Sequence, residues 1–268
     1  MRRLALVILV GVGAGAAAGC GGGGGSGAWQ TYSASGTFGI SALWAFAPDD
    51  VWAGGQVILH FDGTSFMPVS TPTPVYVTDF WGFAPNDLYA VSGDKLLHWD
   101  GAAWSVVDFA GAINPTDLSA VWGTSDGDLW LGDQLNGRVF RWNGTTWSTG
   151  ITQTVMVDDL WGTAGGPVFA VGTFGMSRWN SGVWSDIGGN AADQASGVWG
   201  FGADDVWAVG DAGVISHWNG SSWSQTQVGA FPYYPFLSKV HGSSANDVWA
   251  AGRSSDGKNT GVILHNRQ

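Results

Sequence analysis

The sequence predicts an all-β fold of six similar four-stranded units, and three observations predict it. A tryptophan followed by a small residue recurs at intervals of 37 to 42 residues, from Trp44-Ala45 to the variant His241-Gly242. Most intervals contain an aspartate two residues before an aromatic residue, and a β-run that ends in Asp-Gly or Asn-Gly. Four short strands repeated with such a period are typical of a β-propeller, so we predict six blades.

The first two strands of each unit carry the clearest repeat. The first strand bears the pairs Trp44-Ala45, Trp81-Gly82, Trp122-Gly123, Trp161-Gly162, Trp199-Gly200 and His241-Gly242. The second strand begins at Asp50, Asp87, Asp128, Asp205 or Asp247, and at Pro167 in the fourth unit. Asp and Asn side chains accept backbone N–H bonds in tight turns, so we expect these acids to stabilise the turn. No turn has the six to eight oxygen ligands or so that Ca²⁺ prefers.

The third strand ends in a hairpin turn and the fourth begins with an aromatic residue. In the second unit these are His98-Trp99-Asp100-Gly101 and Trp104. Asp-Gly and Asn-Gly favour a type I′ turn, which needs two residues with positive φ. Histidines or arginines occupy one third-strand position, at His60, His98, Arg141, Arg178, His217 and His265. These side chains would be spread around the ring, so we expect no metal site from them.

The tryptophans support the fold and suggest how the ring closes. Six units with four strands each give 6 × 4 = 24 marked positions, and all 18 tryptophans fall on them. A residue that recurs in every unit is best explained by packing between blades, in preference to glycan stacking. The sixth unit stops after its third strand, at Asn266, and residues 28–33 with Trp29 match the missing fourth. We therefore predict a ring closed by the N-terminal strand, without open sheet edges.

The N-terminus carries a targeting signal. Arg2 and Arg3 precede an apolar run over residues 4–18, and Ala17-Ala18-Gly19-Cys20 follows. This segment resembles the lipobox of bacterial lipoproteins, and the resemblance implies cleavage before Cys20 and acylation of that cysteine. An ordinary signal peptide with an idle cysteine is the alternative. The lack of aspartate at Gly21 favours anchoring to the outer membrane.

These features predict three regions: a signal peptide at 1–19, a lipidated cysteine with a glycine-rich tether at 20–27, and one propeller domain at 28–268. The repeat resembles tryptophan-rich bacterial propellers, including regulator-type propeller repeats, best at residues 126–132. Such propellers host many functions, so the resemblance implies a fold more than a role. The net charge of −11 argues against a nucleic-acid partner. We expect a monomer without cofactor or metal, held to the membrane by its lipid.

The candidate binding site lies where the repeats differ. The connections from fourth to first strand and from second to third strand vary between units, and in a propeller they share one face. The most distinctive are the aromatic segment 229–236 and the long loop 253–261. Tyrosine and arginine are favoured at binding hot spots. The predicted site residues are Phe231, Tyr233, Tyr234, Phe236, Arg253 and Lys258.

Two classes of function remain open from the sequence. The first is a cell-envelope module that binds a protein, peptide or polysaccharide, or acts as a scaffold. The second is a glycan-acting or other hydrolase with its site at the central channel mouth. No catalytic motif is present, and His241 is unusual because it replaces tryptophan on a first strand. The aromatic segment has an alternative role too, as a plug packed over the channel mouth.

Overall fold

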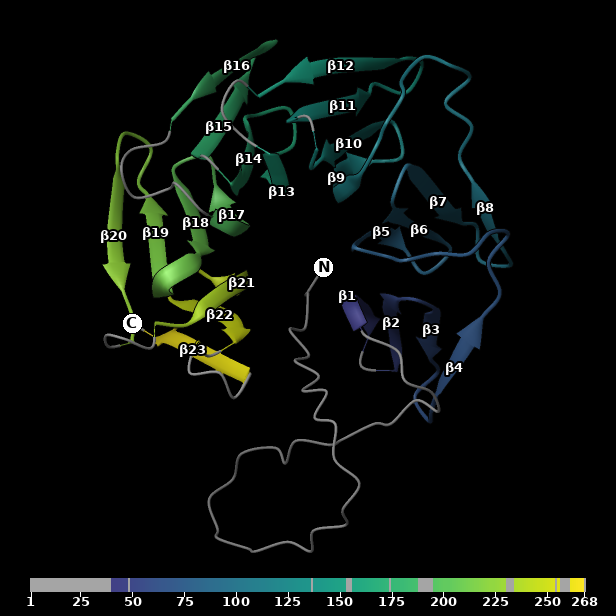
Figure 1. Ribbon diagram of the computed structural model, residues 1–268, viewed down its shortest axis with the longest axis horizontal. Helices are drawn as coiled ribbons and strands as arrows, with labels where there is room; N and C mark the ends of the chain where they lie inside the picture. The colour runs from purple at the N-terminus through teal and green to yellow at the C-terminus, as the bar shows by residue number, and fades with distance from the viewer. Residues whose placement is uncertain are drawn as a thin grey trace, which may run out of the picture.

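The computed structural model confirms a six-bladed β-propeller (Figure 1). It describes residues 40–47, 49–135, 137–152, 156–173, 175–187, 195–229, 234–253, 255 and 261–267. Six antiparallel sheets surround a central axis, each with its first strand innermost. Five sheets have four strands, and the sixth has three among the described residues. The predicted closing strand at residues 28–33 lies outside the described residues, so the ring closure stays a prediction.

The strands occupy the predicted places in each unit. The inner strands are β1 (Ile40–Ala47), β5 (Asp79–Ala84), β9 (Leu118–Ser125), β13 (Met156–Gly162), β17 (Ala195–Gly202) and β21 (Phe236–Ser244). The second strands are β2 (Asp50–Gly55), β6 (Asp87–Ser92), β10 (Asp128–Asp133), β14 (Val168–Thr173), β18 (Asp205–Gly210) and β22 (Asp247–Arg253). The third strands are β3 (Ile58–Phe61), β7 (Lys95–Trp99), β11 (Arg138–Trp142), β15 (Gly175–Asn180), β19 (Val214–Trp218) and β23 (Gly261–Arg267). The outer strands are β4 (Phe66–Val69), β8 (Trp104–Val106), β12 (Trp147–Ile151), β16 (Val183–Asp186) and β20 (Trp223–Gln227).

The chain is almost entirely β-structure in the described part. A short 3₁₀ turn, η1 (Asp211–Gly213), connects β18 to β19. No helix among the described residues is long and apolar enough to span a membrane.

Tryptophans pack each blade on the next, as the sequence predicts. Trp52 on β2 is 1% exposed, and its ring centroid lies 5.0 Å from Trp99 and 5.6 Å from Trp104 in the following blade. Trp130 on β10 repeats this arrangement, 5.0 Å from Trp179. Because offset and edge-to-face aromatic pairs add to the gain from burial, these contacts hold neighbouring blades together.

The small residue after each inner-strand tryptophan has a steric reason. A Cβ atom at Gly200 would lie 2.6 Å from the Trp161 ring of the preceding blade, and one at Gly242 would lie 2.4 Å from Phe201. Both distances are too short for carbon atoms in contact, so glycine is required where an aromatic ring covers the backbone. The Trp-Gly repeat therefore encodes the close approach of neighbouring inner strands.

The expected type I′ turns are wrong for four of the five described hairpins between third and fourth strands. Phe61 pairs with Phe66 across a four-residue loop, in which Gly63 has a φ of 91° but Asp62 has a negative φ. The Asp62 carboxylate accepts the backbone N–H groups of Thr64 and Ser65 at 2.9 and 3.1 Å. Asp100, Asn143 and Asn219 cap their turns in the same way. This local capping competes successfully with the two-residue turn.

Among the five described hairpins, that of the fourth blade is the one with the two-residue turn. Asn180 pairs with Val183, and the intervening Ser181 and Gly182 both have positive φ, at 51° and 97°. The predicted turn type therefore occurs where the Asp-Gly or Asn-Gly signal is absent.

Candidate functional site

The variable connections share one face, but two of them pack against the blades. Val77, before β5, is fully buried beside Phe80. Ile113, between β8 and β9, is buried, and Phe109 in the same connection lies 5.3 Å from Trp147 in an edge-to-face contact. These two connections differ in sequence from the others because their apolar side chains pack against the blades. Tyr76 remains 54% exposed on this face.

The sixth blade presents an aromatic and a basic side chain together. Phe236 and Arg253 are paired across β21 and β22. The Arg253 guanidinium lies 4.8 Å from the centre of the Phe236 ring, and Arg253 is exposed. A guanidinium over an aromatic face is attracted by the ring quadrupole. Two predicted site residues distant in sequence are thus in contact at the edge of this face.

The base of the aromatic segment is anchored to the fifth blade. The Pro235 carbonyl accepts the Gly213 N–H at 2.6 Å, and a Cβ at Gly213 would lie 3.0 Å from the proline ring. Tyr234 is half-buried beside this anchor. The end of the segment is thus held against η1 immediately before the chain enters β21. The predicted site residues Phe231, Tyr233 and Lys258, and the predicted lipidation residue Cys20, lie outside the described residues.

A polar group at the start of the inner strands was missed from the sequence. Asp159 on β13 accepts the backbone N–H of Val198 in the next blade at 3.1 Å. Its Oδ2 also lies 3.4 Å from Nζ of Lys239 on β21, two blades away. Asp79 bonds Val121 of its neighbour in the same way, at 3.0 Å. A sequence signal for these residues was present, because Asp79 and Asp159 are acidic residues on inner strands that should otherwise be apolar.

Asp158 stands beside this group in a different environment. The Gln134 side-chain amide donates to Asp158 at 2.6 Å. Burial raises the pKa of Asp158 above its ordinary value, against that hydrogen bond and the Lys239 charge, which lower it. The register shift between Val157 and Asp159 directs successive aspartates differently. Because Asp159 and Asp79 satisfy backbone groups, they act mainly in joining blades.

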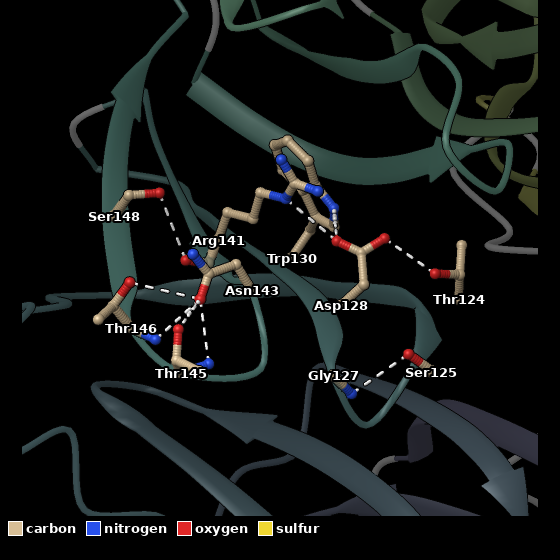
Figure 2. A network of polar contacts seen from close by, with 10 residues as sticks. All are labelled: Thr124, Ser125, Gly127, Asp128, Trp130, Arg141, Asn143, Thr145, Thr146 and Ser148. Carbon is tan, nitrogen blue, oxygen red and sulfur yellow. Dashed lines mark hydrogen bonds and ion pairs between the residues drawn. The ribbon is translucent and has the colours of Figure 1, made fainter.

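The opposite face, at the turns between first and second strands, carries a repeated polar contact. In the third blade the Arg141 Nε donates to Oδ1 of Asp128 at 3.1 Å, and the Trp130 indole donates to the same oxygen at 3.2 Å (Figure 2). The Arg141 guanidinium lies 4.8 Å from the centre of the Trp130 ring. Histidine replaces arginine in four other blades. There Nε2 contacts the aspartate at 2.7–2.9 Å, in the pairs His60–Asp50, His98–Asp87, His217–Asp205 and His265–Asp247.

These contacts correct the role expected for the aspartates. Their partners are side chains, mainly of the second and third strands and also Thr124 of the first strand beside Asp128, whereas backbone capping falls to the hairpin residues such as Asp62. The spread of the histidines around the ring is as predicted. Among the described residues, no group of three or more histidine, cysteine or acidic side chains could hold a metal ion. His241 packs against Trp199, with ring centroids 4.2 Å apart, and so continues the inner aromatic series.

The fold and this distribution of side chains define a six-bladed β-propeller whose repeated residues are structural and whose variable loops gather on one face. No protein-family description matches the sequence, and no curated protein matches it significantly.

Solved structures share the fold at low sequence identity. YCF48 bound to D1 peptide is 18% identical, with a TM-score of 0.62 over 85% of this chain and 81% of that one. Virginiamycin B lyase from Staphylococcus aureus is 11% identical, with a TM-score of 0.68 over 86% and 85%. The extracellular domain of the putative one component system BT4673 from B. thetaiotaomicron is 13% identical, with a TM-score of 0.65, and this chain spans 36% of its length. The likeness to a regulator-type protein agrees with the resemblance of the repeats, and at these identities it concerns the fold.

Proposed function

We propose that this protein is a lipid-anchored propeller of the bacterial cell envelope that binds a protein, peptide or polysaccharide through the variable face of its sixth blade. The observation that carries the proposal is the contact between Phe236 and the exposed Arg253. Aromatic and arginine side chains dominate binding hot spots because they bury large areas and donate several hydrogen bonds. A partner that covers this pair would desolvate it and strengthen the cation–π attraction.

The distribution of the other functional groups supports binding over hydrolysis. A hydrolase with paired carboxylates needs two acids facing across a pocket. Here Asp79 and Asp159 accept backbone N–H groups of neighbouring blades, and Asp159 also faces Lys239. His241 is packed on Trp199. No specific arrangement of the described residues at the channel mouth favours the hydrolase alternative.

The structural neighbours support a binding role and an extracytoplasmic location in general terms. YCF48 was solved with a bound peptide, and the B. thetaiotaomicron neighbours are extracellular domains. The lipid anchor is supported by Cys20 and the residues before it. Several acyl chains hold a protein firmly at a membrane.

The binding proposal is tested by capture from cell-envelope extracts and on a glycan array. We compare the unmodified protein with the Tyr233→Ala/Tyr234→Ala/Phe236→Ala variant and with Arg253→Ala. A matched control is Val183→Ala, which removes a 66% exposed apolar side chain from the hairpin of β16. We expect capture to be lost in the triple variant and in Arg253→Ala, with their circular dichroism spectra unchanged, and to be kept in the control. Equal capture by all four proteins would place binding elsewhere. Unfolding of the triple variant would show that the aromatic segment 229–236 is a packed plug.

The anchor is tested separately. Cys20→Ser should abolish incorporation of a labelled fatty acid and release the protein from the membrane fraction. Unchanged labelling of the variant would contradict the lipobox assignment.

A further inference from the structure

The fourth blade breaks the polar contact that the other five share. In those blades an aspartate at the start of the second strand contacts a histidine or arginine on the third strand. The distances are 2.8 Å for His60–Asp50, 2.9 Å for His98–Asp87, 3.1 Å for Arg141–Asp128, 2.8 Å for His217–Asp205 and 2.7 Å for His265–Asp247. Each contact also lies beside an aromatic side chain of the second strand, as Figure 2 shows for Trp130.

The fourth blade keeps the cation and the ring but replaces the acid. Phe169 pairs with Arg178 across β14 and β15, as Trp130 pairs with Arg141 in the third blade. The position of Asp128 is taken by Pro167, with the same spacing from the preceding Trp-Gly pair. Proline has no carboxylate, so the blade's own partner for Arg178 is missing.

Arg178 is left without a polar partner for its side chain among the described residues. Its guanidinium lies 5.8 Å from the centre of the Phe169 ring, and its Nε is buried without a hydrogen-bond acceptor. A buried donor that finds no acceptor is unfavourable, and more so when it is charged. The Arg178 guanidinium therefore lies over the Phe169 ring and lacks the aspartate carboxylate that contacts the equivalent histidine or arginine in the other five blades.

The turns around Arg178 are also more open than their counterparts. In the first, second and fifth blades, a Cβ on the hairpin glycine (Gly63, Gly101 or Gly220) would lie 2.7–3.0 Å from the Asp or Asn that precedes the second strand. In the fourth blade no atom lies within 4 Å of the Cβ position of Gly182 or of Gly165 in the facing turn. The two turns at this end of the fourth blade, in which Arg178 lacks its acid, are thus open at Gly165 and Gly182.

We propose that Arg178 forms a binding site for a carboxylate group supplied by a ligand. One carboxylate oxygen lies beside the Arg178 guanidinium, as Oδ1 of Asp128 lies beside that of Arg141, and accepts from its terminal N–H groups. Arginine suits this role because it stays charged and donates in a fixed planar geometry. The site lies at the turns opposite the variable loops, so it is independent of the proposed site around Phe236 and Arg253.

The test follows the Nε–Hε resonances of ¹⁵N-arginine-labelled protein during titration with sodium acetate. Arg178→Lys assigns the resonance of interest, and Arg141, already bonded to Asp128, is the internal control. We expect a saturable shift at Arg178, none at Arg141, and none with acetamide. Sodium chloride and phosphate at matched ionic strength test for general anion attraction. The proposal would be overturned if the Arg178 resonance shifted linearly with acetate concentration without saturating, or shifted equally with chloride or phosphate.

A second variant supplies the missing acid within the chain. Pro167→Asp should move the Arg178 resonance toward that of Arg141 and remove its response to acetate. An acetate response that persists in this variant, although the new carboxylate is paired with Arg178, would contradict the assigned geometry. Titrations with N-acetylaspartate amide and with galacturonate then show whether a peptide-like or a sugar-like carboxylate fits better.

Discussion

Nε2 of His217 lies 2.8 Å from Oδ1 of Asp205, on adjacent strands of the fifth blade. The same oxygen accepts the Trp207 indole N–H at 3.1 Å, and the His217 ring stacks on Trp207 with centroids 4.1 Å apart. One carboxylate thus fixes two side chains, and the arrangement recurs in the first, second and sixth blades as far as the histidine–aspartate contact is concerned. The repeat of polar residues is therefore part of what holds each blade in register.

Asp205→Ala should destabilise the protein, because it leaves the His217 and Trp207 donors without their acceptor. We expect a loss of about 1–3 kcal/mol in the free energy of unfolding. Asp204→Ala is the matched control, since this neighbouring aspartate is exposed. Urea denaturation measures both, and an equal change in midpoint for the two variants would show that the contact adds nothing.

Trp130→Ala should cost more, because the indole is 3% exposed and contacts Trp179 of the next blade. Removing a buried tryptophan leaves a large cavity, for which we expect a loss of about 3–5 kcal/mol. Trp130→Phe keeps a ring between the blades and removes the bond to Asp128, so its loss should be smaller. Identical losses for the two substitutions would indicate that packing between blades is not the main term.

Asp158→Asn should stabilise the protein at pH 7. Burial raises the pKa of Asp158, so the folded state binds its proton more tightly than the unfolded state does. Such a group contributes stability below its unfolded pKa of about 3.9, and that contribution is lost as the pH rises through the raised pKa. The advantage of the variant should therefore shrink as the pH falls toward about 4.

Asp94→Asn provides a control of opposite sign. The hydrogen bond from Lys95 lowers the pKa of Asp94, so its contribution to stability is present at neutral pH and is lost in acid. Thermal unfolding between pH 3 and pH 8 or so compares the two variants. A lower midpoint for Asp158→Asn at pH 7 would contradict the expected penalty of the buried charge.

Deleting residues 28–33 should destabilise the whole ring if they complete the sixth blade. Among the described residues, β23 pairs with β22 alone, whereas each other third strand also pairs with a fourth. Trp249 on β22 is 37% exposed, against 1% for Trp52 in the first blade. Deleting residues 21–26 of the tether is the control, and it should leave thermal stability unchanged. Equal stability of both deletion variants would rule out closure by this strand.

The fold was predictable because its signals are local and repeated. Trp44, Trp81 and Trp122 recur at nearly constant spacing, and a unit that cannot bury its apolar face alone must stack on neighbours. The hairpin geometry was predicted less well. Asp62 and its equivalents have side chains able to cap a longer loop, and the choice between two turn types depends on energy differences that dipeptide preferences do not resolve.

The candidate site was only partly accessible from the sequence. The contact between Phe236 and Arg253 joins residues that were selected for composition, but their pairing depends on the register of β21 with β22. The link between Asp159 and Lys239 spans two blades and has no counterpart in sequence spacing. The sequence identified Arg178 as one member of a repeat. That Pro167 deprives it of a partner could be recognised only from the Asp128–Arg141 contact in the structure.

The sequence by itself determined the number of blades, the order of the strands and the packing of the tryptophans between blades, because the repeated pattern of aromatic, small and turn residues is local in the sequence. Tertiary structure decided which polar side chains meet. Hydrogen bonds such as Gln134–Asp158 and Asp159–Val198 form between residues that only the stacking of blades brings within about 3 Å, the distance at which such bonds act.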